Sequence, residues 1–177
     1  MADLSAVVRE LDRHAAAAGW DRRAQVFALV STRDLVEREP GLAGGLADAG
    51  ELTPVQQDEL PGEELEPLLQ RIVWPDSVAG CAAVVERLVL PPEADAEIPA
   101  DREEAAAFAS SHPGRQEVRI TAAATRAGET GCALRLREHD DDALVLVGPD
   151  LVPGLVEMLR ATLEDEPHRD PGDGSAQ

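Results

Sequence analysis

The sequence contains no lysine and no tyrosine, so all 16 of its cationic side chains are arginines. The absence of lysine excludes a P-loop lysine, a Schiff-base lysine and a lysine general base. Aromatic surface is also scarce, since only 2 tryptophans and 2 phenylalanines occur among 177 residues. Hydrophobic residues nevertheless make up 44% of the chain. We therefore expect a core of small aliphatic side chains with closely packed backbones.

Positive charge is scarce, because 35 acidic residues give a net charge of −19. Nucleic acids and anionic membranes bind clustered positive charge, so we expect neither as a partner. No uncharged apolar run approaches the roughly 18 residues that cross a bilayer. Residues 1–14 also lack the apolar region of a signal peptide. These features predict a cytoplasmic protein.

The common motifs for nucleophiles, metals and cofactors are missing as well. Cys81 and Cys132 lie in predicted strands, where buried reduced thiols act as small hydrophobes; a disulfide or a catalytic role is less favoured. The run at residues 139–142 (HDDD) is typical of a solvated turn, because adjacent side chains cannot converge on one ion. We therefore expect no metal, no cofactor and no enzymatic activity of the common classes.

The apolar pattern predicts one α+β domain over residues 1–163 and a disordered acidic tail over residues 164–177. Helical spacing over residues 3–18 follows a cap at Asp3 and ends at Gly19. Further helices are expected near residues 32–39, 65–72, 101–109 and 150–159, and strands at 24–30, 78–90, 116–126, 130–137 and 144–147. Residues 53–56 match the start of a single helical turn. We predict a mostly antiparallel sheet of four or five strands, with helices packed mainly on one face.

Residues 116–137 form the clearest element, a β-hairpin with one apolar and one arginine-rich face. A loop that closes Arg126 on Thr130 keeps apolar residues opposite one another. The candidate binding residues on and near the second face are Arg119, Arg135, Arg137, Arg115 and Arg87. Such a face could bind a small anion, or an acidic segment of a protein partner. The alternative is a solvated face paired with acids of the same chain, such as Glu117, Glu138 or residues 63–66.

A second candidate contact lies at residues 72–76, where Trp74 and Asp76 precede a predicted central strand. They could line a pocket or contact a partner, whereas the alternative is a packed corner. Helices on one face of the sheet would leave the other face partly apolar near residues 78–85. That surface predicts a homodimer.

Six segments carry a resemblance to a known family: GWDRRAQVFALV (19–30), LTPVQQDELP (52–61), IVWPDSVAGCAAVVERLVLPP (72–92), HPGRQEVRITAAATRAG (112–128), LRLREHD (134–140) and DLVPGLVEML (150–159). Together they resemble a family of uncharacterised actinobacterial proteins of about this length. The resemblance implies a bacterial cytoplasmic origin and no particular chemistry. The element order is also similar to small chaperone-like α+β folds that bind partner segments. We therefore expect a chaperone-like binding or adaptor module, with a small-molecule enzyme or sensor that uses an arginine-lined anion site as the alternative.

Overall fold

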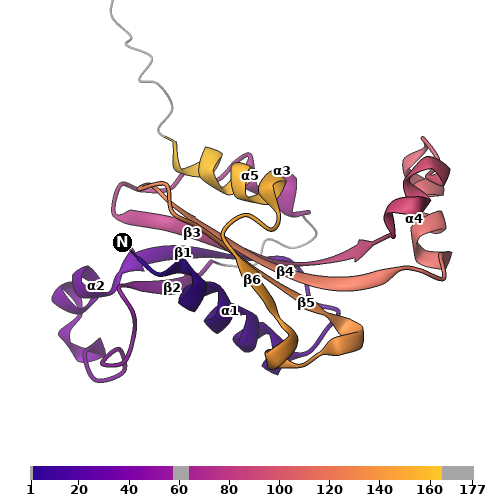
Figure 1. Ribbon diagram of the computed structural model, residues 1–177. Coiled ribbons are helices and arrows are strands. Elements are labelled where there is room, and N and C mark those ends of the chain that lie inside the picture. Colours follow the sequence, from indigo (N-terminus) through magenta and orange to yellow (C-terminus); the bar gives the residue numbers. More distant parts are fainter. Residues whose placement is uncertain (1, 58–63, 165–177) are drawn as a thin grey trace, which may run out of the picture.

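The computed structural model describes residues 2–57 and 64–164, so residues 165–177 of the predicted tail lie outside the described residues. The chain has the predicted α+β fold, with an antiparallel sheet in the order β2-β1-β3-β4-β5-β6 (Figure 1). The strands are β1 (Gln25–Ser31), β2 (Leu52–Gln56), β3 (Val78–Val89), β4 (Gln116–Thr125), β5 (Thr130–Leu136) and β6 (Leu146–Gly148). The sheet has six strands rather than the predicted four or five.

The additional strand is β2, where we predicted a helical turn. Leu29 of β1 pairs with Pro54 of β2 in antiparallel register. β2 lies at the edge of the sheet, where a proline without an N–H group is tolerated. The pairing with β1 therefore overrides the local helix-start pattern at Thr53 and Pro54.

Helices cover both faces of the sheet rather than mainly one (Figure 1). Helix α1 (Leu4–Ala18) lies on one face, and α3 (Leu65–Leu69) and α5 (Pro153–Leu163) lie on the other. The cluster under α1 includes Leu4, Val8, Leu11, Phe27, Leu29 and Ala82. The cluster under α3 and α5 includes Leu65, Leu69, Cys81, Ala83, Leu155 and Leu159. Residues 78–85 are buried or half-buried within one chain, so the expectation of a bare apolar face there was wrong.

The β4–β5 hairpin keeps the predicted faces but shifts in register. Arg119 pairs with Arg135, and Ala124 pairs with Thr130. The sequence pattern predicts Arg126 opposite Thr130. Instead, the backbone N–H of Arg126 donates to the carbonyl of Ala79. This bond draws Arg126 out of the hairpin and leaves Thr125 as the end of β4.

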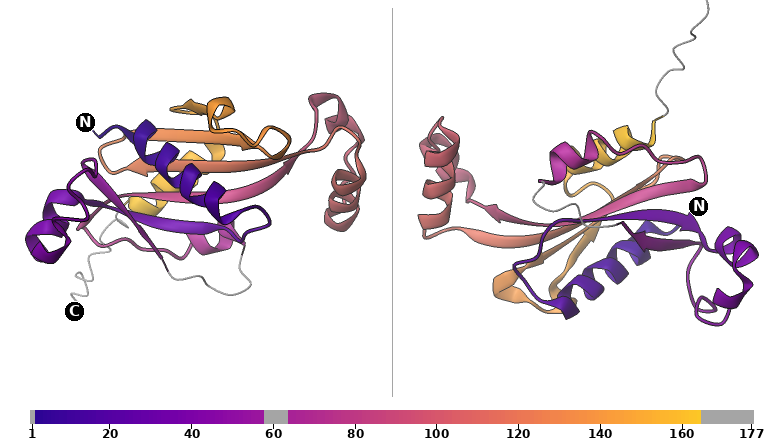
Figure 2. Two further views of the ribbon diagram at one scale, coloured as in Figure 1. Left: turned by 90° about the horizontal axis from the view of Figure 1, so that it is seen from below. Right: turned by 180° about the vertical axis from the view of Figure 1, so that it is seen from behind.

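An arm projects from one end of the molecule, because β3 and β4 extend beyond the other strands (Figures 1 and 2). Its tip carries η2 (Pro92–Glu97) and α4 (Arg102–Ser111). No residue of α4 is buried. At the opposite end, α2 (Thr32–Arg38) and η1 (Pro40–Leu42) precede β2. None of the described helices is long and apolar enough to cross a bilayer.

Candidate functional site

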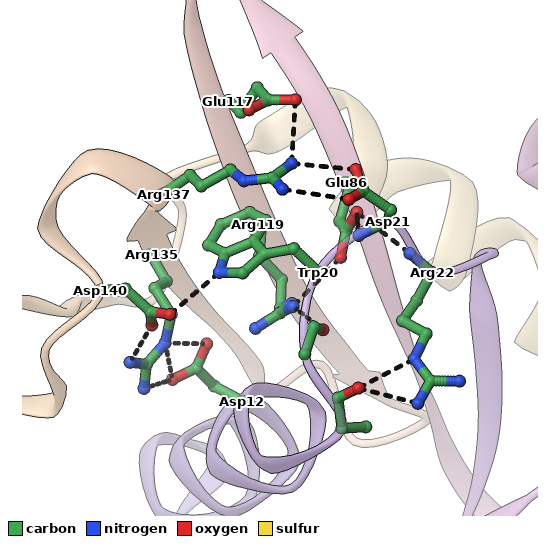
Figure 3. Close-up of polar contacts among 12 residues, drawn as sticks. Asp12, Trp20, Asp21, Arg22, Glu86, Glu117, Arg119, Arg135, Arg137 and Asp140 are labelled. Carbon is green, nitrogen blue, oxygen red and sulfur yellow. Dashed lines mark hydrogen bonds and ion pairs between the residues drawn. The ribbon is translucent and has the colours of Figure 1, made fainter.

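Three of the predicted arginines come together on the α1 face of the sheet, around the side chain of Trp20 (Figure 3). We call Arg119, Arg135 and Arg137 the arginine cluster. Arg119 and Arg135 face each other across β4 and β5. Arg137 follows directly in η3 (Arg137–His139). The hairpin therefore places Arg119 and Arg135 on one face, as its alternation predicts, and Arg137 joins them from η3.

Arg135 is bound by three carboxylates. Its side chain is only 2% exposed, and its Nε and Nη2 atoms donate to Asp12, with a distance of 2.6 Å from Nη2 to Oδ2. Nη1 donates to Asp140 at 2.9 Å, and Nη2 also donates to Asp142. The hydrogen bonds to Asp12 are the main reason why the pKa of Arg135 is raised. Arg135 is thus a permanently charged group held inside the protein by acids of the same chain.

Asp12 reaches Arg135 because it lies within the buried stripe of α1, between Leu11 and Ala15. The helix begins at a cap in which Asp3 accepts from the backbone N–H of Ser5. A carboxylate at a buried position needs a cationic or hydrogen-bonding partner, since desolvation penalises an unpaired charge. Asp12 was therefore visible in the sequence as an acid inside an apolar stripe, although we did not single it out.

Arg119 is 1% exposed and is held differently. Its guanidinium carbon lies 4.3 Å from the centre of the Trp20 ring, which places the cation over the aromatic face. Nη2 donates to Glu86 at 3.1 Å and to the carbonyl of Gly19. Among the described residues, Nη1 has no hydrogen-bond partner. Stacking and one carboxylate therefore fix Arg119 beneath the end of α1.

Arg137 closes the cluster on its exposed side. It donates to Asp21 through two nitrogens, at 2.9 and 3.0 Å, and to Glu117 at 3.2 Å. The hydrogen bond from Arg137 lowers the pKa of Asp21 and correspondingly raises the pKa of Arg137. The ring nitrogen of Trp20 donates to Asp140 at 3.0 Å, and this bond is the main cause of the lowered pKa of Asp140.

Within the described residues, carboxylates outnumber the arginines of the cluster. The acids paired with it are Asp12, Asp21, Glu86, Glu117, Asp140 and Asp142. They come from α1, the following turn, β3, β4 and the segment after β5. The cluster therefore ties distant parts of the chain together. A small anion would have to compete with these acids, and anion binding here stays a prediction.

Arg115 and Arg87 do not join the cluster. Arg115 lies in the turn after α4, at the tip of the arm, and donates to the carbonyl of His112. Arg87 pairs in register with Val118, which places it on the opposite sheet face from Arg119. There it forms an ion pair with Glu66.

Trp74 and Asp76 are also separated from the cluster. Trp74 is buried in the core beneath α5, and its ring nitrogen donates to the hydroxyl of Thr162 at 3.0 Å. Its indole ring nevertheless helps to line a pocket beside α5. Asp76 is exposed in the loop before β3. These contacts match the packed-corner alternative for Trp74.

The remaining candidate groups are buried or occupied. Cys81 and Cys132 are both free and buried, and burial raises the pKa of the Cys81 thiol to about 11. In the HDDD turn, Asp140 and Asp142 bind Arg135, and Asp141 accepts from the N–H of Ala143. Over residues 2–57 and 64–164, His, Cys, Asp and Glu form no group that could hold a metal ion.

An apolar groove of about 770 Å³ lies on the other face of the sheet, and we did not predict it from the sequence. Its lining residues are Val89, Gln116, Val118, Ile120, Leu134, Leu136, His139, Leu144, Leu146, Leu151 and Val152. The groove crosses β4 and β5 and runs from the base of the arm to β6. Leu144 and Leu146 are 58% and 62% exposed. Exposed leucines beside a buried apolar floor are typical of an interaction surface.

A protein-family comparison matches residues 4–164 to the model of the PPA1309-like proteins. The chain belongs to this family. The matched residues include the arginine cluster and the groove. No curated protein and no solved structure matched the chain significantly.

Little in the sequence of this PPA1309-like chain signals the groove. Leu144 and Leu146 alternate with Ala143 and Val145, which predicts a strand but not which face stays open. β6 pairs with β5 at only a few positions, and α5 covers just part of the same face. The opening thus depends on where β6 ends and where α5 is placed.

Proposed function

We propose that this protein is a binding or adaptor module without catalysis, and that its apolar groove takes up an apolar segment of a protein partner. The observation that carries the proposal is the exposure of Leu144 and Leu146 beside a floor of buried valine and isoleucine. Pockets that bind ligands or partner segments are concave and mostly apolar, with few polar groups. Gln116 and His139 are the polar residues of this lining.

The alternative proposal is an enzyme or sensor that binds a small anion at the arginine cluster. It is supported by three neighbouring guanidinium groups, one of which has a buried Nη1 without an acceptor among the described residues. It is weakened by the acids that already pair with them. A bound anion would lie close to Asp12, Asp140 and Asp142, and like charges that are close together repel. We therefore prefer the groove as the binding site.

Selection from a displayed library of random peptides tests the preferred proposal. Peptides selected on the wild type should be rich in apolar residues, and their affinity should fall at least about tenfold for Leu146→Glu, because the new charge must be desolvated in the groove. Leu42→Glu is the matched control, since Leu42 is also exposed but lies in η1, outside the groove. Equal binding to both variants, or selection of acidic peptides that need Arg137, would contradict the proposal.

A further inference from the structure

The shape of the groove indicates which kind of segment it accepts. Helices α3 and α5 cover part of this sheet face, and α1 covers the other. A sheet face in a folded domain is normally covered by helices or by another sheet. The groove is the part of the α5 face, from the end of β3 to β6, that no described helix covers. A further helix beside α5 would complete this layer.

The dimensions of the groove agree with a short helix. The floor crosses from β3 to β6, and neighbouring strands lie about 4.8 Å apart, so the crossing is on the order of 14 Å. A helix rises 1.5 Å per residue, so about ten residues span that distance. Leu144 and Leu151 belong to the lining and are exposed. An apolar stripe of about three turns would cover the floor and contact both leucines.

The charge around the groove indicates which residues should flank the apolar stripe of that helix. Glu138 and Asp150 are exposed and adjoin the lining residues His139 and Leu151 in the chain. The whole chain carries a net charge of −19. Complementary potentials favour encounter and select against acidic partners. We propose that the groove binds an amphipathic helix of a partner protein whose apolar stripe is flanked by arginine or lysine; this inference rests on the proposed function.

Two other occupants fit less well. An extended segment could pair with the free edge of β6, but β6 has only three residues and is followed by Pro149. Short edge strands are poor templates for pairing. A second copy of the chain could offer its exposed helix α4. That helix carries Glu103 and Glu104 in its first turn, and these acids would meet the acidic margin of the groove.

Synthetic peptides of about 14 residues test the proposal. The first peptide has leucines at positions i, i+3, i+4 and i+7 and arginines at both ends. Three controls are its scrambled isomer, the same stripe with glutamate ends, and a peptide with alternating leucines and arginine ends. Affinity is measured by fluorescence anisotropy with the wild type, Leu146→Glu and Leu42→Glu, and helix content by circular dichroism.

The first peptide should bind the wild type and Leu42→Glu at least about tenfold more tightly than its isomer and the glutamate peptide, with a gain of helix on binding. It should lose at least about tenfold in affinity with Leu146→Glu. Tightest binding of the alternating peptide would overturn the helix but leave the groove as a binding site. Absence of binding by every peptide would overturn both proposals. Light scattering that shows a dimer broken by Leu146→Glu would assign the groove to a second copy instead, and would also overturn both.

Discussion

The arginine cluster and the apolar groove lie on opposite faces of the same hairpin and differ in how their side chains are satisfied. Arg135 is almost completely buried, and Asp12, Asp140 and Asp142 accept its hydrogen bonds. Leu146, two strands away from Arg119, is 62% exposed and largely uncovered. The sequence pattern predicts the charged region, whereas it does not predict the apolar groove. A row of arginines indicates a binding site only if the fold does not already supply their partners.

Removing Asp12 should lower the stability of the protein more than any other substitution considered below. Asp12→Ala leaves the buried guanidinium of Arg135 without its main partner, and we expect a loss of about 3–5 kcal/mol in the free energy of unfolding. Urea denaturation measures this loss. The double variant Asp12→Leu with Arg135→Met removes both charges and should recover much of the stability. A single variant within about 1 kcal/mol of the wild type would show that the pair is not structural.

Trp20→Ala should have the next largest effect. It removes the ring beneath Arg119 and the hydrogen bond to Asp140, and we expect a loss of about 1–3 kcal/mol. Trp20→Phe keeps a ring but removes the hydrogen bond, so it should lose less. Urea denaturation of both variants separates the two contributions. Equal losses would mean that stacking on Arg119 contributes nothing.

The lowered pKa of Asp140 predicts a pH-dependent effect of smaller size. The carboxylate of Asp140 is favoured in the folded protein, so its stabilisation is fully present above the unfolded pKa near 3.8 and is lost as the pH falls through the folded pKa. Asp140→Asn should therefore be less stable than the wild type at pH 7, by less than about 1 kcal/mol because Asp140 is partly exposed. Denaturation midpoints between pH 7 and pH 2 should converge. Asp150→Asn, at an exposed position, is the control, and a constant difference for Asp140→Asn would contradict the prediction.

Leu146→Glu should leave stability within about 0.5 kcal/mol of the wild type, because its side chain is already exposed. The same is expected for Leu42→Glu. Thermal unfolding of both variants checks this. A large loss for Leu146→Glu alone would show that the groove is part of the core, and would remove the contrast between the two faces.

Small anions should have the smallest effect, with no measurable shift of the melting temperature by phosphates, carboxylates or nucleotides. The carboxylates paired with the arginine cluster already neutralise its positive charge. Arg135→Ala with Arg137→Ala should be less stable than the wild type and equally unresponsive. If an anion at 100 times its dissociation constant stabilised only the wild type, by about 2.7 kcal/mol, the cluster would be a ligand site after all.

Local patterns in the sequence were sufficient where the determining contacts are close in the chain. The stripe and cap of α1, its end at Gly19, and the alternation of β4 and β5 fixed these elements and the faces of their side chains. The same patterns failed at β2 and at the hairpin turn. There, pairing with β1 and the hydrogen bond from Arg126 to Ala79 decided the outcome.

The sequence by itself determined the α+β class, the absence of lysine chemistry, the scarcity of positive charge and the placement of Arg119 and Arg135 on one face. Only the tertiary structure decided that this face is closed by α1 and that the opposite face stays open between the arm and β6. The physical reason is distance along the chain. Asp12 contacts Arg135 across 123 positions of the chain, and no local pattern specifies such a contact. Nor does a local pattern specify the placement of α5, which leaves Leu146 exposed.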